Sequence, residues 1–172
     1  MKKIIYLSLF LGLSASFATV LLAGINSITA PIIEEQRLAV FAQAVTDTFP
    51  NQEGFTVAAE GDEIPFASIV QILEVFEAGQ TVGFIYSKEV NGFGGPMSYI
   101  LGVDVNGNFV NFDFIAHGET PGFGDRLYEP AWYEQFRGPS IHSDIPIISG
   151  VTVTTSAIIN ALDDLRADFA TR

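Results

Sequence analysis

The chain opens on a long apolar stretch. Ile4–Ile25 reads IIYLSLFLGLSASFATVLLAGI, and no charged residue stands between Lys3 and Glu34. A helix of that length crosses the hydrocarbon layer of a bilayer, which is roughly 30 Å thick. We expect one transmembrane helix within an N-terminal anchor, residues 1–30. The alternative is a cleaved signal peptide with Ser16-Phe17-Ala18 as its cleavage site.

Apolar positions return at helical spacing after Pro31, a residue that suits the first turn of a helix. They predict a second, amphipathic helix that runs from Ile32 to about Phe49. The pattern then changes to short β-type runs between Phe55 and Phe114. The four runs are residues 69–78, 81–90, 97–105 and 109–117.

Turn signals separate these runs. Asn91-Gly92 lies between the second and third, and Val105–Asn108 lies between the third and fourth. Successive hairpins make an antiparallel sheet. Three more elements are expected after it: a short helix at Glu129–Phe136, a last strand at Ile145–Val153 and a closing helix at Ser156–Ala170. The apolar face of that last helix consists of Ile158, Ile159, Leu162, Leu165 and Phe169. The pattern therefore predicts an α+β fold, an antiparallel sheet with flanking helices, in one domain at residues 31–172.

The charges are distributed unevenly. The net charge is −12, and all 20 acidic residues follow the apolar stretch, whereas Lys2 and Lys3 precede it. The positive-inside rule places the N-terminus in the cytoplasm and the domain outside, as a single-pass protein of the cell (inner) membrane. Nucleic acid is excluded as a partner, since it requires a basic surface. The chain has no cysteine, so any redox role needs a bound cofactor.

Glycine is concentrated in three segments, at residues 92–96, 119–124 and 149–152. Each is consistent with a plain turn, and each also suits the close approach of a backbone to a ligand. In the third, a strand that leads into a helix capped by Thr154 or Thr155 places free N–H groups beside Thr152. That arrangement favours a phosphate.

These segments together resemble the FMN-binding domain family. The residues that carry the resemblance are SGVTVTT at 149–155, HGETPGFG at 117–124 and GFGGP at 92–96. Within the family, the chain resembles the G subunit of Rnf electron-transport complexes, which is related to the C subunit of the sodium-pumping NADH:quinone reductase. Pro146 stands where the family usually has aspartate, Val151 where alanine is usual, and Phe123 where leucine is common.

The resemblance implies FMN joined to Thr152 by a phosphoester bond, which a separate flavin transferase forms outside the cytoplasm. No group on this chain is expected to be catalytic, and the two distant histidines and scattered carboxylates show no metal-ligand spacing, so no metal is expected. The implied cofactor-binding residues are Thr152, Ser149, Gly150, Thr154, Thr155, Glu119, Thr120, Pro121, Gly122 and Gly124.

Three other residues have two interpretations each. His117 is either a flavin contact or a turn residue, and Trp132 is either a flavin contact or part of the core. Arg126 either neutralises a phosphate or balances nearby carboxylates. A hydrolase built on Ser149, His117 and Asp144 is disfavoured, because no nucleophile elbow surrounds the serine.

The resemblance implies an electron-carrying subunit of an ion-translocating ferredoxin:NAD oxidoreductase of the Rnf type, with the other subunits of that complex as its partners. Substrate turnover is expected from the complex and not from this chain alone. Two alternatives stay open: a stand-alone flavoprotein at the cell surface, and a membrane-tethered binding module without a cofactor.

Overall fold

The computed structural model describes residues 2–119 and 124–172, and it contains two compact units, Met1–Ala39 and Val40–Arg172. The helices are α1 (Lys2–Thr48), α2 (Pro130–Tyr133) and α3 (Thr152–Phe169). The strands are β1 (Gly54–Glu60), β2 (Ile69–Glu77), β3 (Gln80–Asn91), β4 (Pro96–Asp104) and β5 (Phe109–His117). Three 3-10 turns complete the order: η1 (Gly61–Glu63), η2 (Gly124–Tyr128) and η3 (Glu134–Phe136).

The first unit consists of the N-terminal part of α1. By length and composition, α1 contains one candidate membrane span, and its apolar side chains are exposed. Hydroxyl groups within it bond to carbonyls of the same helix, as Thr19 does to Ala15 and Thr29 to Ile25. A helix that satisfies its own polar groups in this way suits a hydrocarbon environment.

Helix α1 is continuous through Pro31, so the expected start of a second helix there is wrong. Proline removes only one backbone donor, and helices in an apolar environment tolerate such an interruption. The predicted end near Phe49 is confirmed. The division of the chain at residue 30 stays a prediction.

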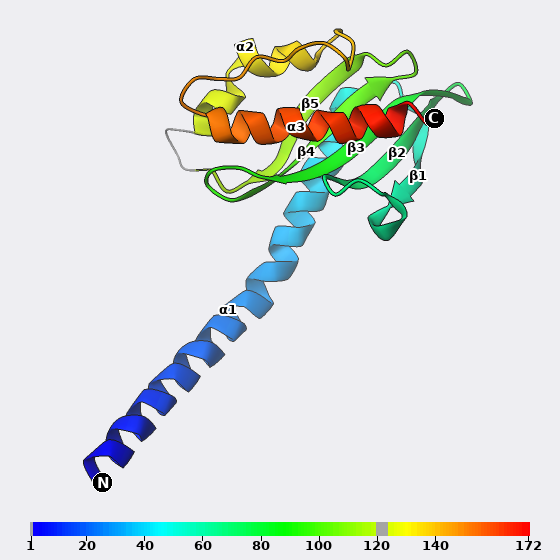
Figure 1. Cartoon of the computed structure of the whole chain (residues 1–172). Coiled ribbons are helices and arrows are strands. Elements are labelled where there is room, and N and C mark those ends of the chain that lie inside the picture. Colours follow the sequence, from blue (N-terminus) through cyan, green and yellow to red (C-terminus); the bar gives the residue numbers. More distant parts are fainter. Residues whose placement is uncertain (1, 120–123) are drawn as a thin grey trace. The chain divides into compact units, whose positions relative to one another are not determined.

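The second unit is built on a five-stranded antiparallel sheet in the order β1-β2-β3-β4-β5 (Figure 1). All four predicted runs are strands, and β1 is an additional edge strand. Its residues are mostly exposed, which explains the weak apolar signal. The β2–β3 turn has positive φ at Ala78 and Gly79, as a two-residue hairpin turn requires. The antiparallel fold class is therefore confirmed.

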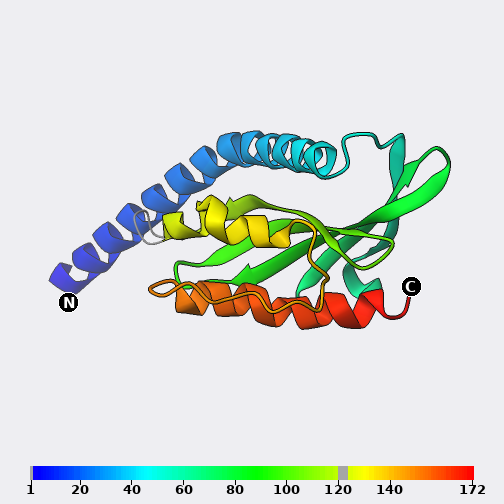
Figure 2. The same cartoon turned by 90° about the horizontal axis from the view of Figure 1, so that it is seen from above.

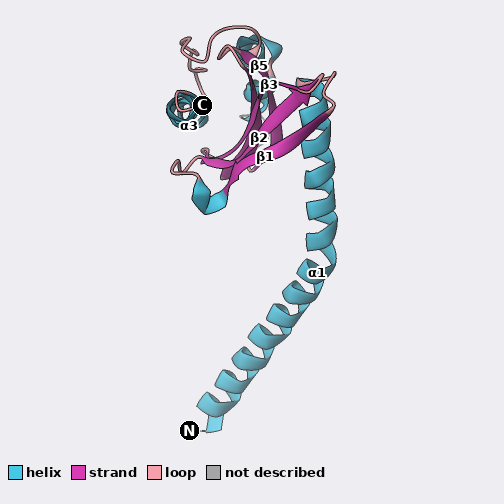
Figure 3. Ribbon diagram, turned by 90° about the vertical axis from the view of Figure 1, so that its right-hand side faces the viewer, coloured by secondary structure: helices cyan, strands magenta, loops and turns pink. Residues whose placement is uncertain are grey.

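The sheet has a core on each face. On one face, β-sheet side chains such as Tyr99 and Phe112 pack with Leu162 of α3 and Trp132 of α2. On the other face, Val45 and its neighbours at the end of α1 pack against Ile85 and Ile100. Figures 2 and 3 show the sheet between these helical layers.

Two predictions at the C-terminal end are wrong. Residues 145–151 form a loop instead of a strand. Pro146 cannot donate to a sheet ladder, and its carbonyl accepts a hydrogen bond from the Trp132 indole at 3.1 Å. Helix α3 begins at Thr152, four residues before the predicted start. Threonine has a low intrinsic helix preference, so the first turn of α3 is stabilised by the burial of the helix's apolar face against the sheet.

Candidate functional site

The loop that precedes α3 is held by side chains from the segment before it. Arg126 in η2 donates a hydrogen bond to the carbonyl of Ser149. Trp132 in α2 holds the carbonyl of Pro146, as described above. Gly150 has a φ of 90°, a conformation that residues with a side chain rarely adopt. A Cβ at this position would lie 3.5 Å from the Arg126 guanidinium. These hydrogen bonds therefore fix the position of the loop and of the first residues of α3.

The first turn of α3 lacks a side-chain cap among the described residues. Val151 is the N-cap residue, and Thr155 donates its hydroxyl to the Val151 carbonyl at 2.9 Å. The expected capping by Thr154 or Thr155 is therefore wrong. The backbone N–H groups of residues 152–154 have no acceptor in a preceding helical turn, which leaves them available to an anion at the positive end of the helix dipole.

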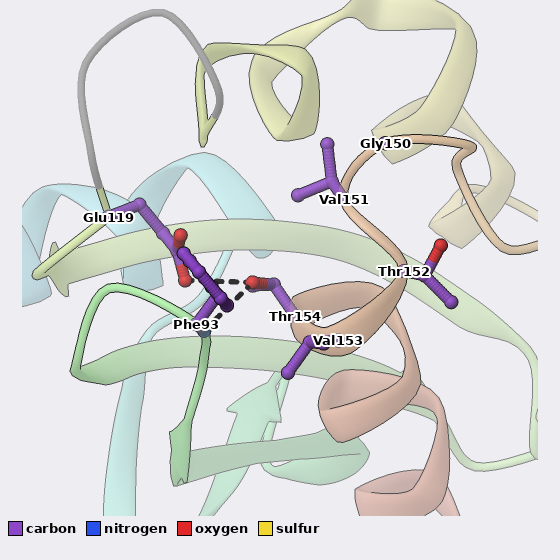
Figure 4. A pocket seen from close by; sticks show the side chains of 7 residues that line it. All are labelled: Phe93, Glu119, Gly150, Val151, Thr152, Val153 and Thr154. Carbon is purple, nitrogen blue, oxygen red and sulfur yellow. Dashed lines mark hydrogen bonds between the residues drawn. The ribbon is translucent and has the colours of Figure 1, made fainter.

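Thr152 and Thr154 point in opposite directions, because residues two apart lie on opposite sides of a helix. Thr154 is fully buried, and its hydroxyl donates to Glu119 Oε1 at 2.8 Å. Thr152 is exposed, and its hydroxyl has no hydrogen-bond partner within the described part of the chain. Figure 4 shows the two side chains on either side of the helix start.

Glu119 connects three segments. Its carboxylate accepts the hydrogen bonds of Thr154 in α3 and, at 3.4 Å, of the Gly94 N–H in the β3–β4 turn. A Cβ at Gly92 would collide with the Glu119 carboxylate, and a Cβ at Gly124 would collide with its Cβ. Both glycines therefore make room for Glu119, which is buried. This explains why two of the three glycine segments come together here.

A cavity of about 450 Å³ lies between these segments (Figure 4). Its volume is in the usual range for small-molecule pockets, about 300–1,000 Å³. Its described lining consists of Phe93, Glu119, Gly150, Val151, Thr152, Val153 and Thr154. The sequence pattern had assigned no role to Phe93 or Val153; a phenylalanine between glycines was the only available signal for the first.

The predicted site residues occupy different places relative to this cavity. Gly150, Thr152, Thr154 and Glu119 line the cavity, whereas Ser149 and Thr155 flank it and Gly124 supports Glu119. Thr120, Pro121, Gly122 and Phe123 lie outside the described residues.

The three residues with two interpretations are also placed. Trp132 belongs to the core, where its ring lies 5.2 Å from that of Phe136. Arg126 holds the Ser149 carbonyl and lies 3.6 Å from the Glu129 carboxylate. His117 is the exposed last residue of β5, with its ring 6.3 Å from that of Phe114.

A second cavity of about 460 Å³ has none of the predicted site residues among its described lining. Among its described lining residues are Asp113, Asn111 and Arg137. Arg137 donates to the Asn111 side chain at 3.1 Å. Burial raises the pKa of Asp113 above its ordinary value, and the nearby Asp47 adds to this effect. The glycine segments and the α3 N-terminus are not among its described lining, so we place the candidate site at the first cavity.

The residues of the first cavity fit the group that the sequence resemblance implies. FMN has a phosphate, which suits the uncapped N–H groups of α3, and a large planar ring, which suits the apolar side chains of Phe93, Val151 and Val153. The exposed hydroxyl of Thr152 lies where the two regions meet.

Comparison with known proteins identifies relatives. Residues 92–166 match the FMN-binding domain family. The G subunit of the Na(+)-translocating ferredoxin:NAD(+) oxidoreductase complex of Acetobacterium woodii is 26% identical over 171 residues, which cover 94% of this chain and 82% of that protein. The G subunit of the ion-translocating oxidoreductase complex of Stutzerimonas stutzeri is 26% identical over 184 residues, which cover 94% of this chain and 78% of that protein.

Among solved structures, the crystal structure of Shewanella oneidensis NqrC matches 73% of this chain and 74% of its own, with 15% identity and a TM-score of 0.49. The sequence matches confirm the resemblance described above: residues 92–166 match the FMN-binding domain family, and the two relatives named here are G subunits of ion-translocating oxidoreductase complexes.

Proposed function

We propose that this chain is a membrane-anchored electron carrier with FMN joined through its phosphate to Thr152. The accessibility of Thr152 is the main support. Five hydroxyl residues stand between positions 149 and 158, and of these Thr152 alone is both exposed and part of the cavity lining. Thr154 and Thr155 are fully buried and bonded to other groups.

The attachment reaction is a phosphoryl transfer. A flavin transferase uses FAD as the donor: a bond forms between Thr152 Oγ1 and the FMN phosphorus, the pyrophosphate bond of FAD breaks, AMP leaves, and the hydroxyl proton is released. The α3 N–H groups then face the phosphate. When bound, the flavin accepts and donates electrons, and this chain's residues hold and shield it.

The relatives support a place in a complex of the Rnf type, with the other subunits as partners. The apolar part of α1 supports a membrane anchor, and Lys2 and Lys3 before it support a cytoplasmic N-terminus with the FMN domain outside. A covalent tether suits that side of the membrane, where lost FMN could not be replaced from the cytoplasm.

The experiment is co-expression of the full chain with a flavin transferase, followed by intact mass measurement and a denaturing gel viewed under ultraviolet light. The wild-type chain should gain the mass of one FMN less one water and should give a fluorescent band. Thr152→Ala should abolish both signals. Ser156→Ala, a half-buried hydroxyl one turn later, is the matched control and should retain both. An unmodified wild-type chain, or a modified Thr152→Ala chain, would contradict the proposal.

A further inference from the structure

Phe93 is exposed on a turn that the structure holds rigidly. With 77% of its surface accessible, it is the most exposed large apolar side chain among the described residues from 40 onward. Its own N–H donates to Thr154 Oγ1 at 3.1 Å, and the adjacent Gly94 N–H donates to Glu119. Gly92 closes the turn with a hydrogen bond to the Gly95 carbonyl at 2.9 Å. The backbone that carries Phe93 is therefore fixed from both sides.

This arrangement uses buried groups to position an exposed ring. The Glu119 carboxylate and the Thr154 hydroxyl are both buried, and each supplies a hydrogen bond to the turn. Solvation alone would favour burial of the phenylalanine ring. A rigid turn that instead exposes a phenylalanine at a cavity wall indicates that the ring contacts a ligand.

The chemistry of the cavity indicates which ligand. Phe93 lines the same cavity as Thr152, together with Val151 and Val153, so an aromatic face and two aliphatic side chains surround the space beside the attachment point. In FMN, a flexible ribityl chain separates the phosphate from the ring system, so a tether at Thr152 alone leaves the ring unrestrained. A planar aromatic ring gains stabilisation from contact with another ring.

We propose that Phe93 lies against the isoalloxazine ring of FMN attached to Thr152. The proposal rests on the attachment proposed above. It assigns two different roles within the site: Phe93 contacts the ring, whereas Glu119 and Thr154 are positioning residues that act on the cofactor through the turn.

The test is the Phe93→Trp variant of the full chain, co-expressed with a flavin transferase and purified in detergent. An indole in contact with a flavin ring quenches flavin emission. Intact mass should show the same degree of loading as in the wild-type chain, and emission per loaded flavin should fall several-fold. Phe55→Trp is the matched control, since Phe55 is also exposed. Phe55 pairs with Val75, which pairs with Gly83 at the far end of β3 from the turn. Its emission should be unchanged.

A second variant, Phe93→Leu, keeps an apolar side chain but removes the ring. The iodide quenching constant of its loaded flavin should rise by about twofold or more, because the ring loses an aromatic contact. If Phe93→Trp does not acquire flavin, the iodide quenching of Phe93→Leu tests the contact on its own.

The outcomes separate the two proposals. Equal emission from Phe93→Trp and Phe55→Trp, or iodide quenching unchanged in Phe93→Leu, overturns the contact with Phe93 and leaves the attachment at Thr152 intact. A wild-type chain without flavin overturns both.

Discussion

The two ends of α3 are stabilised in opposite ways. At the C-terminal end, the Tyr86 hydroxyl donates to Asp168 at 3.0 Å, and Arg172 donates to the same carboxylate at 2.6 Å. At the N-terminal end, the first N–H groups have no side-chain cap, and Thr152 is exposed. Polar groups are paired at one end and left available at the other.

The middle of α3 resembles its C-terminal end, because its polar groups are also paired. Lys88 of β3 is fully buried and donates to the Ala161 carbonyl at 2.7 Å, while Asp164 accepts hydrogen bonds from Ser68. Burial of a charged amine is costly and requires partners of this kind. The comparison indicates that the C-terminal part of the helix stabilises the domain, whereas its first turn lines the candidate cavity. Variants at the two ends should therefore separate stability from flavin loading.

The largest effect is expected from Asp168→Ala. It removes the partner of both Tyr86 and Arg172, and should lower the free energy of unfolding by about 3 kcal/mol. Loading at Thr152 should persist in the folded fraction. Denaturant unfolding of the full chain in detergent, followed by the fluorescence of Trp132, measures this change.

The control is Asp163→Ala. Asp163 pairs with Arg166 at 2.8 Å, but its side chain is 75% exposed, so its loss should cost less than about 1 kcal/mol. A similar loss from both variants would contradict the distinction between the buried and exposed carboxylates of α3.

A somewhat smaller effect is expected from pH. Burial lowers the pKa of Lys88 from 10.5 to about 8, an effect that Asp164 and Asp168 partly oppose. Between these values the unfolded chain holds more protons than the folded chain, so stability should rise with pH. The gain between about pH 7 and pH 10 should be about 2 kcal/mol.

Above about pH 10 the trend should reverse, since burial raises the pKa of Tyr86 and Tyr99 above that of the unfolded chain. Lys88→Met should remove the rise below pH 10, which urea unfolding at a series of pH values would reveal. A rise of equal size in Lys88→Met would assign the pH dependence to other groups.

The smallest effect is expected at the open end, from Thr154→Val. The Glu119 carboxylate loses a donor and the Phe93 N–H loses its acceptor, so the free energy of unfolding should fall by about 1–2 kcal/mol. Thr155→Val is the control because Thr155 is equally buried, yet its hydroxyl bonds only to carbonyls of its own helix turn. It should cost less than about 0.5 kcal/mol. Equal losses from the two variants would show that Glu119 does not depend on Thr154.

The sequence was informative where periodic burial determined structure. Strands β2 to β5 alternate or run apolar because they are covered, and each was predicted within a few residues. The edge strand β1 was missed, since its side chains are mostly exposed and carry little pattern. Residues 145–148 read Ile-Pro-Ile-Ile, an apolar run like that of a covered strand, but Ile147 is exposed, and hydrogen bonds to Trp132 and Arg126 hold this stretch and the residues that follow as a loop.

The site was predicted in its residue types but not in its contacts. Gly150 and Thr152 could be proposed because glycine and hydroxyl residues before a helix suit a phosphate, whereas Glu119 was implied only by the family resemblance. That Glu119 bonds to Thr154, which is 35 positions away, depends on how α3 packs, and no local pattern encodes it. For the same reason Phe93 was passed over: its exposure is a property of the folded turn.

The strands lie in the sheet in the order in which they occur in the sequence, and this affects when the cavity forms during folding. Every strand pairs with the one next to it in the chain, so the sheet requires only short-range closures, whereas the Phe93 to Thr154 bond joins residues 61 positions apart. The binding cavity exists only after the last helix of the polypeptide has docked. The proposed flavin transfer therefore requires the finished domain, and we expect that chains cut short before α3 are not modified.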